Sequence, residues 1–164
     1  MKEIPLTRGY VTLVDDDDYE WLSQWKWYAA NDRTNVYVQR AERLDNGKQR
    51  TIRMHRLILG VGKGIVVDHI DRDGLNNQRS NLRIATPQQN TWNRRKFRSN
   101  TSGFRGVAWD SSNQKWKAKI NINGKPTHLG LFDTPEEAAW MYDHAARIHY
   151  GEFASLNFPD EVAS

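Results

Sequence analysis

The 164-residue sequence contains no cysteine, which excludes both a disulfide framework and a zinc site built on thiolates. No apolar run approaches the roughly 18 residues that a membrane-spanning helix needs, so we expect no membrane partner. The first residues, Met1 to Pro5, do not resemble a secretory signal peptide. These absences predict a cytoplasmic protein in which any bound metal relies on oxygen and nitrogen donors.

Positive charge gathers in the middle of the chain. The whole sequence has 24 Lys and Arg against 20 Asp and Glu, a formal net charge of +4. Residues 68–102 carry seven basic and three acidic side chains, whereas residues 103–164 carry six basic and eight acidic ones. A basic segment between less basic flanks is typical of local contact with phosphate groups and not of a general polycation.

The first half of the chain is predicted to be rich in strands, over residues 9–14, 36–43 and 49–55, with a hairpin turn at 45–47. The acidic run 15–18 is typical of solvated residues at the start of a short helix, and a metal cluster is the less favoured alternative. Trp21, Trp25 and Trp27 are expected in the core, because large aromatic side chains supply much of the buried area of a small domain.

The most informative segment runs from residue 65 to residue 90. A short β-branched run leads into Asp68 and His69, and a second apolar run over residues 82–85 predicts a returning strand. Thr86 and Pro87 then predict the N-cap and the first position of a helix that carries Asn90. The order is therefore strand, loop, strand and helix.

Four side chains of this segment, Asp68, His69, Asn81 and Asn90, suffice to bind one hard cation and to activate one water molecule. His69 is the candidate general base because imidazole titrates near working pH. The oxygens of Asp68 and Asn90 suit one Mg²⁺ or Mn²⁺ ion and not zinc. Asn81 is expected to bond backbone in the loop and to hold His69 in place, while His55 either contacts phosphate or packs under the site. Such a set is the minimal equipment for hydrolysing a phosphodiester bond.

Residues 53–95 resemble the HNH endonucleases. The separations of 13 residues from Asp68 to Asn81 and of 22 from Asp68 to Asn90 are similar to those of phage-type HNH homing endonucleases. The resemblance implies a ββα-metal fold in which His69 is the catalytic base, Asp68 and Asn90 bind the metal, and Asn81 is the middle asparagine of the site. Asn90 stands in place of a histidine, and packing alone must hold the motif because the cysteine pairs of zinc-stapled members are absent.

A basic linker is predicted over residues 94–102, where arginines are followed by small polar residues. It divides an expected N-terminal domain, residues 1–93, from an expected C-terminal domain, residues 103–160. Four of its side chains are candidate contacts to the DNA backbone: Arg94, Arg95, Lys96 and Arg98.

Three strands and one helix are predicted for the C-terminal domain, the strands over residues 107–109, 115–123 and 127–132. A capping box at Thr134 starts the helix and Gly151 ends it. Along the middle strand, polar side chains alternate with apolar ones and are expected on one open face of the sheet: Lys115, Lys117, Lys119 and Asn121.

Residues 103–159 resemble the plant Apetala-two/ethylene-response-factor (ERF) DNA-binding domain. The motifs that carry the resemblance include Gly103-Phe104-Arg105-Gly106-Val107 and Leu129-Gly130-Leu131-Phe132-Asp133. The resemblance implies a sheet that lies in the major groove of DNA and reads it with outward side chains.

By position in the ERF pattern, Arg105 matches a DNA-contacting arginine and His128 takes the place of a contacting tryptophan. Ala108 and Asp110 stand where plant members have arginines, so the plant target sequence does not transfer. The other candidate DNA contacts are Lys117, Lys119, Asn121 and Trp109. Trp109 either stacks on DNA or caps the core.

The sequence therefore predicts an α+β protein: an N-terminal β-rich region with a ββα-metal HNH core, then a small domain of three antiparallel strands and one helix. We expect a site-specific DNA endonuclease of the HNH homing type that uses one divalent metal ion and nicks double-stranded DNA as a monomer. A dimer is the alternative assembly. A non-catalytic DNA-binding regulator and a restriction or defence nuclease are the rival functions.

Overall fold

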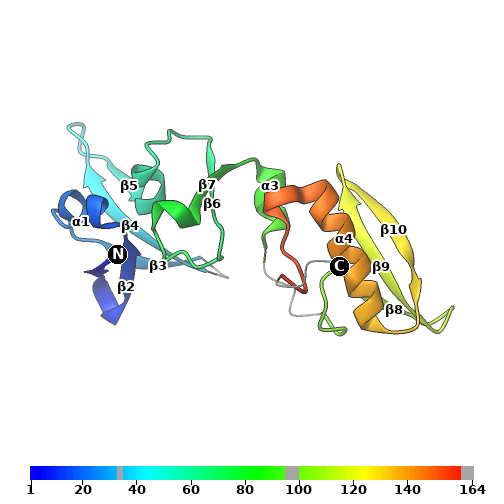
Figure 1. Cartoon of the computed structure of the whole chain (residues 1–164). Helices are drawn as coiled ribbons and strands as arrows, with labels where there is room; N and C mark the ends of the chain where they lie inside the picture. Colours follow the sequence, from blue (N-terminus) through cyan, green and yellow to red (C-terminus); the bar gives the residue numbers. More distant parts are fainter. Residues whose placement is uncertain (33–34, 95–99, 160–164) are drawn as a thin grey trace. The chain divides into compact units, whose positions relative to one another are not determined.

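The computed structural model of the chain describes residues 1–32, 35–94 and 100–159. They form two compact units, Met1–Asn90 and Thr91–Ser164 (Figure 1). Each unit combines antiparallel sheets with short helices, so the predicted α+β class is confirmed. No helix in the described ranges is both long enough and apolar enough to span a membrane.

The N-terminal unit contains three antiparallel sheets. Strands β1 (Lys2–Pro5) and β2 (Val11–Val14) form a hairpin around the 3-10 turn η1 (Thr7–Gly9), and helix α1 (Asp16–Leu22) follows. The second sheet has the order β3 (Tyr28–Asp32), β4 (Asn35–Arg43), β5 (Gln49–Arg53), and helix α2 (Met54–Ile58) follows it directly. Strands β6 (Val66–His69) and β7 (Leu82–Ala85) pair as a hairpin, with the 3-10 turn η2 (Arg79–Asn81) before β7 and helix α3 (Pro87–Trp92) after it.

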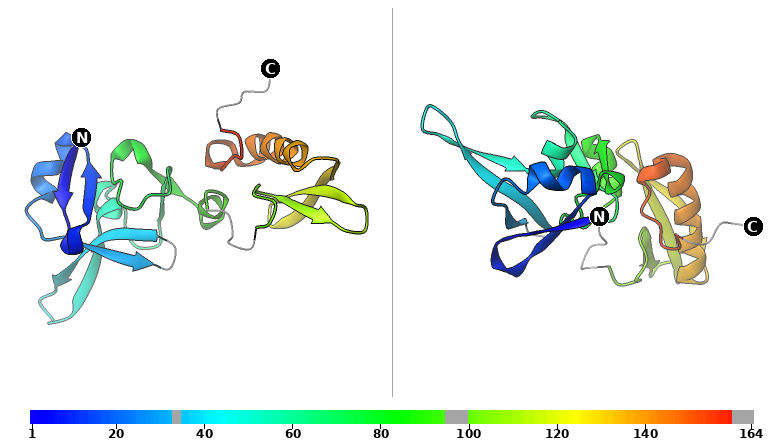
Figure 2. Two further views of the ribbon diagram at one scale, coloured as in Figure 1. Left: turned by 90° about the horizontal axis from the view of Figure 1, so that it is seen from below. Right: turned by 60° about the vertical axis from the view of Figure 1, so that its left-hand side comes forward.

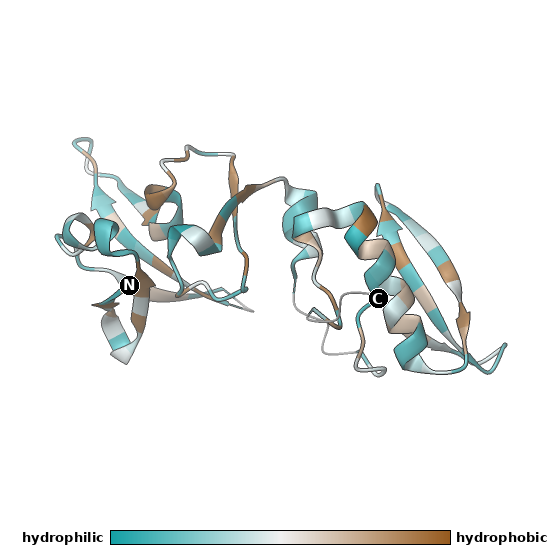
Figure 3. Cartoon of the chain, viewed as in Figure 1, coloured by the Kyte–Doolittle hydropathy of each residue, from teal (hydrophilic) through white to brown (hydrophobic). Residues whose placement is uncertain are grey.

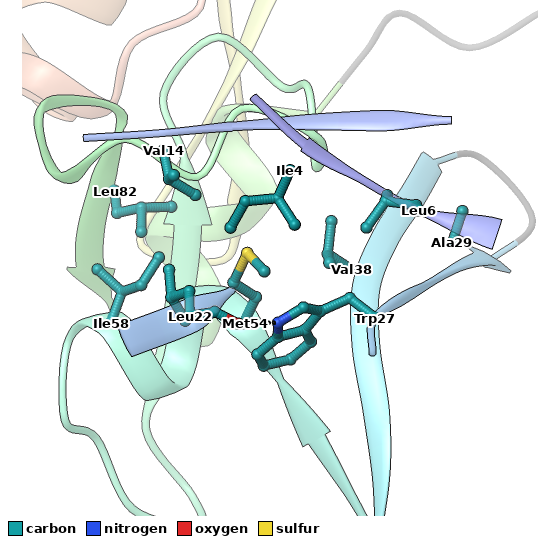
Figure 4. Packing of buried hydrophobic residues seen from close by; sticks show 10 residues of the cluster. All are labelled: Ile4, Leu6, Val14, Leu22, Trp27, Ala29, Val38, Met54, Ile58 and Leu82. Atoms are coloured by element: carbon teal, nitrogen blue, oxygen red, sulfur yellow. Dashed lines mark hydrogen bonds between the residues drawn. The ribbon is translucent and has the colours of Figure 1, made fainter. Parts of the chain in front are cut away.

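One apolar core joins these sheets, as Figure 4 shows. Met54 is fully buried near the middle of the drawn cluster, and Ile58, one helical turn later, is buried on the same side of α2. The strand predicted over residues 49–55 therefore ends at Arg53, because Met54 begins a helix that fills this core. Trp27 is buried and its indole N–H donates to the Leu22 carbonyl at 2.9 Å.

Trp21 and Trp25, which were expected in the core, are only partly buried and pack against it. The ring of Trp25 meets the rings of Trp21 and of the buried Trp27 edge to face. The acidic run does start a helix, but its solvated character is wrong for Asp18. That carboxylate is buried and accepts 2.8 Å hydrogen bonds from both Nε and Nη2 of Arg79. Asp15 occupies the N-cap position of α1, yet its side chain accepts from the backbone N–H of Arg79 at 2.7 Å. The acidic run thus ties α1 to the turn before β7.

The C-terminal unit is a three-stranded antiparallel sheet covered on one face by one helix (Figure 2). Its strands are β8 (Val107–Asp110), β9 (Lys115–Ile122) and β10 (Lys125–Phe132), with β9 in the centre. Helix α4 (Pro135–Tyr150) starts at the predicted capping box on Thr134 and is followed by the turn η3 (Gly151–Phe153). Figure 3 shows hydrophilic and hydrophobic residues alternating along the strands, as expected for a sheet with one covered face.

Candidate functional site

The loop between β6 and β7 is clamped by strands on both sides. On one side, the N–H of Leu13 in β2 donates to the Leu75 carbonyl at 3.0 Å, and the Asn77 N–H donates to the Leu13 carbonyl at 2.8 Å. On the other side, the amide of Asn35 in β4 donates to the Arg72 carbonyl at 3.1 Å. A Cβ added at Gly74 would lie 2.2 Å from the Val36 carbonyl oxygen, so only glycine fits this approach to β4. The loop is therefore set by elements far upstream in the sequence.

Asp68 and His69 are the last two residues of β6, and both are buried, at 5% and 4% exposed. Adjacent residues on a strand point to opposite faces, so the side chains of Asp68 and His69 contact different groups. Asp68 lies opposite Arg83 in the β6–β7 register, and its Oδ2 accepts from Arg83 Nε at 2.9 Å and from Nη2 at 2.8 Å. These two hydrogen bonds to one oxygen orient the carboxylate.

His69 sits in an aromatic and amide environment. Its ring centroid lies 5.0 Å from that of His55, edge to face, and 5.9 Å from that of Tyr37. Its Nε2 is 3.4 Å from Oδ1 of Asn77. Burial lowers the pKa of His69, and the contact with Asn77 and the nearby aspartates only partly oppose that change. Burial thus favours the neutral imidazole, which is the form that can accept a proton.

His55 packs under the site, which is one of the two roles open to it from the sequence. It is 4% exposed, on α2, and its ring contacts both His69 and Tyr37. Within the described parts of the chain its buried Nδ1 has no hydrogen-bond partner. Burial, reinforced by the charges of its neighbours, lowers the pKa of His55 to about 3.

Asn81 bonds the loop backbone, as predicted. Its Oδ1 accepts from the Asp71 N–H at 3.0 Å, and its Nδ2 donates at 2.9 Å both to the Asn76 carbonyl and to Asp71 Oδ1. Its own carbonyl accepts from the Ile70 N–H at 2.9 Å. Asn81 thus closes the two ends of the loop onto each other directly after His69.

Asn90 lies on a separate element, half-buried in α3, and its N–H donates to the Thr86 carbonyl at 3.0 Å. A capping box starts this helix, in which Gln89 N–H donates to Thr86 Oγ1 at 3.1 Å and Thr86 N–H donates to Gln89 Oε1 at 2.8 Å. The pairing of Asn90 with Asp68 around one metal ion stays a prediction.

The donor chemistry fits a hard divalent cation. Asp68 and Asn90 offer a carboxylate and an amide oxygen, the ligand types that Mg²⁺ and Mn²⁺ prefer. No group of three or more His, Cys, Asp or Glu side chains arranged for a metal is found among the residues that the structure covers. A site with only two protein ligands leaves its remaining positions to water and phosphate oxygens, as is usual for Mg²⁺.

In the C-terminal unit, the register gathers several predicted DNA contacts on the face opposite α4. Lys119 lies opposite His128, and both are exposed, as is Asn121 on the same strand face. Lys117 shares this face, but its ammonium donates to Asp110 Oδ2 at 3.0 Å. The Lys117 contact lowers the pKa of Asp110. We call Lys117, Lys119, Asn121 and His128 the open face.

Trp109 does not belong to the open face. It lies opposite Trp116 in the β8–β9 register, on the side of the sheet that carries Val107 and Ala118 and that α4 covers. Its ring packs edge to face on that of Trp116, with the ring centroids 5.2 Å apart, and the residue is 47% exposed. Trp109 therefore neither joins the other candidate contacts nor seals the core completely.

Arg105 is half-buried just before β8. Its N–H donates to Asn157 Oδ1 at 2.7 Å, and its guanidinium donates to the Arg94 carbonyl. Arg94 is exposed, and the predicted linker contacts Arg95, Lys96 and Arg98 lie outside the described residues.

The chain is similar in sequence to known HNH endonucleases. Residues 54–92 match the family model described as HNH endonuclease. The chain is 36% identical over 153 residues to the uncharacterized HNH endonuclease L560 of Acanthamoeba polyphaga mimivirus, an alignment that covers 92% of this chain and 76% of that protein. The chain belongs to the HNH endonuclease family. It is thus a nuclease, and HNH nucleases generally use a divalent metal ion.

Two further relatives are similar to shorter stretches of this HNH endonuclease. It is 37% identical over 94 residues to protein 3.8 of Escherichia phage T7, covering 57% of this chain and 77% of that protein. It is 44% identical over 63 residues to the ethylene-responsive transcription factor ERF024 of Arabidopsis thaliana, covering 37% of this chain and 34% of that protein. The predicted combination of an HNH nuclease with an ERF-like DNA-binding part is confirmed. No solved structure matches the chain.

Proposed function

We propose that this HNH endonuclease is a site-specific enzyme of the homing type, which hydrolyses phosphodiester bonds of double-stranded DNA with one Mg²⁺ or Mn²⁺ ion. The observation that supports this most is the buried imidazole of His69, in contact with Asn77, next to the oriented carboxylate of Asp68. A general base must be unprotonated and fixed, because proton transfer depends steeply on both its protonation state and its position.

Each side chain of the site has one role in this proposal. His69 takes a proton from the attacking water, and Asn81 keeps the loop closed so that the imidazole does not drift. Asp68 and Asn90 would hold the metal, with Arg83 keeping the carboxylate in place. The bound cation supplies charge relief for the leaving oxygen.

Site selection is assigned to the C-terminal unit. The open face presents an imidazole, an amide and two ammonium groups on one side of a sheet, where base edges and phosphates are within reach of outward side chains. Arg94 and Arg105, with Arg95, Lys96 and Arg98, add contacts to the DNA backbone. One HNH site cuts one strand, so we propose that the monomer nicks and that a dimer is needed for a double-strand break.

The test is cleavage of a supercoiled plasmid library with a randomised insert, with Mg²⁺, Mn²⁺, Zn²⁺ or a chelator. The proposal predicts nicked circles with Mg²⁺ or Mn²⁺, no product with the chelator, and a common sequence around the cut. Asp68→Asn and Asn90→Ala should raise the metal concentration needed, whereas Asp45→Asn, in an exposed turn, should not. DNA binding without cleavage under any metal would instead favour a non-catalytic regulator. A restriction or defence nuclease would share this chemistry, and neighbouring genes would separate it from a homing enzyme.

A further inference from the structure

A buried polar chain runs under His69 and ends on a strand outside the matched HNH segment. Thr12 of β2 and Asn77 of the loop are both fully buried, at 0% exposed. Thr12 Oγ1 donates to the Leu75 carbonyl at 2.6 Å. Asn77 Nδ2 donates to Thr12 Oγ1 at 2.9 Å and to the Gly74 carbonyl at 3.3 Å. Oδ1 of the same amide faces His69 Nε2.

The direction of each hydrogen bond between Thr12, Asn77 and His69 follows from counting the available protons. A carbonyl only accepts, so the single hydroxyl proton of Thr12 goes to Leu75. The hydroxyl oxygen must then accept from Asn77, so the atom that faces it is the amide nitrogen. The Gly74 carbonyl demands a donor at the same position. The amide of Asn77 therefore has one possible orientation, with its oxygen toward His69.

An amide oxygen facing an imidazole nitrogen decides which nitrogen carries the hydrogen. Asn77 Oδ1 can only accept, so Nε2 of His69 must donate, and in a neutral ring the lone pair then lies on Nδ1. The distance of 3.4 Å is long, as catalytic hydrogen bonds often are before substrate binds.

We propose that Asn77, oriented by Thr12, is a positioning residue that fixes the Nε2–H tautomer of His69, so that Nδ1 is the atom that takes the proton from water. The inference rests on the proposed function only for the role of Nδ1. In this inference the N-terminal hairpin helps to orient His69, because β2 supplies Thr12 and also pairs through Leu13 with the loop. The matched segment, residues 54–92, does not contain Thr12, so the base is oriented by a part of the chain added to the HNH core.

The direct test is NMR of the full-length, metal-free chain with ¹⁵N-labelled histidine, at a pH where His69 is neutral. Long-range ¹H–¹⁵N correlations show which ring nitrogen carries the hydrogen. The inference predicts Nε2–H for His69 in the native chain and in Thr12→Ser, which keeps the hydroxyl. Thr12→Val and Asn77→Leu should gain a detectable population of the Nδ1–H form. The control Thr7→Val, at an exposed threonine of the same hairpin, should match the native chain.

A second readout is single-turnover cleavage alongside DNA binding. Thr12→Val and Asn77→Leu should lower the cleavage rate by about 10–100-fold, as loss of an orienting partner typically does, with DNA affinity unchanged. Thr12→Ser should restore most of the rate. Because Asn77→Leu alters a buried site, the nearly isosteric Thr12→Val decides the matter if the leucine variant does not fold.

The outcomes separate the inference from the proposed function. An Nδ1–H tautomer in the native chain, or identical tautomers and rates in the native chain and Thr12→Val, would overturn the inference even if the enzyme cuts DNA. An Nε2–H tautomer that depends on Thr12, in a chain that cuts no DNA with any metal, would support the tautomer assignment and overturn the nuclease proposal.

Discussion

At the scale of single residues, two buried neutral histidines make the stability of the N-terminal unit depend on pH. The pKa of His55 is about 3 in the folded chain, against an ordinary value of 6.5. Between these values the unfolded chain binds a proton that the folded chain does not. Stability is therefore fully present above pH 6.5 and falls as the pH drops toward 3, by about 1.4 kcal/mol per pH unit for this group. The lowered pKa of His69 acts in the same direction.

His55→Phe should weaken this pH dependence, because the variant keeps a ring in the contact with Tyr37 and His69 but has no proton to bind. The measurement is the free energy of unfolding in denaturant at several values between about pH 7 and pH 4. His144→Phe, at an exposed position of α4, is the matched control and should leave the slope unchanged. An equal slope in the native chain and His55→Phe would show that His55 is not the group that titrates.

The motif residues of the site could be predicted from the sequence, and their supporting residues could not. Asp68, His69 and Asn81 stand out by type and spacing, and the bonds of Asn81 to loop backbone follow from the need to close a short loop. Asn77 and Tyr37 gave no such signal. Their contacts with His69 depend on how β2 and β4 pack against the loop, and that packing is set by non-local contacts.

At the scale of elements, alternation along strands predicted the two faces of β9, and the same rule applied to β8 places Trp109. The side chain of Trp109 points to the same face of the sheet as that of Val107, which is buried. The side chain of Asp110 points to the opposite face, where it meets Lys117. Without this alternation applied to β8, the sequence leaves Trp109 open between stacking on DNA and capping the core. The end of the strand at Arg53 was missed for another reason: residues 49–55 are too few to distinguish a strand from a helix start.

The turn before β8 is closely packed at Gly106. Gly106 has φ +75, and a Cβ there would lie 2.0 Å from the Tyr142 ring and 2.7 Å from the Lys119 carbonyl oxygen. Gly106→Ala should therefore destabilise the unit by about 3 kcal/mol or more, the sum of backbone strain and overpacking. Gly124→Ala, with φ +81 but nothing within 4 Å, isolates the backbone term and should cost about 1 kcal/mol. Thermal unfolding of both variants checks this, and equal losses would contradict the close packing at Gly106.

The two central lysines of the open face differ in their partners, so they should differ on DNA. Among the described residues Lys119 has no ion-pair partner, whereas Lys117 is paired with Asp110. Lys119→Ala should lower the slope of log affinity against log salt by about one, as expected for one lost phosphate contact. Lys117→Ala should change it less, because Asp110 already compensates that charge. The measurement is the DNA affinity of both variants over a series of salt concentrations. A larger change in slope for Lys117→Ala would mean that DNA displaces Asp110 from Lys117.

At the scale of the whole molecule, the C-terminal unit includes residues that precede the predicted domain start. Trp92 stacks on Tyr150 with ring centroids 4.2 Å apart and an interplanar angle of 12°. A fragment of residues 91–164 should therefore be more stable than one of residues 103–164, by about 1 kcal/mol or more for the lost aromatic pair and its buried area. Both fragments should bind DNA and cut none. Denaturant unfolding compares them, and equal stabilities would mean that Trp92 contributes nothing to the unit.

The fold class and the order of the two parts followed from the sequence, because hairpin turns, caps and alternating strands are local signals. The clamping of the β6–β7 loop by the N-terminal hairpin could not be predicted from the sequence, since it rests on hydrogen bonds between residues more than sixty positions apart, such as Thr12 with Leu75.

The central claim is that His69 is the general base of a metal-dependent nuclease. The most direct measurement is the single-turnover cleavage rate of His69→Ala in saturating Mg²⁺, with DNA affinity measured in parallel. The account predicts a rate lower by about 10²–10⁴-fold with DNA affinity almost unchanged, because the base acts on water and not on binding. His144→Ala should cleave like the native enzyme. A His69→Ala variant that binds DNA and cuts it as fast as the native chain would contradict the account.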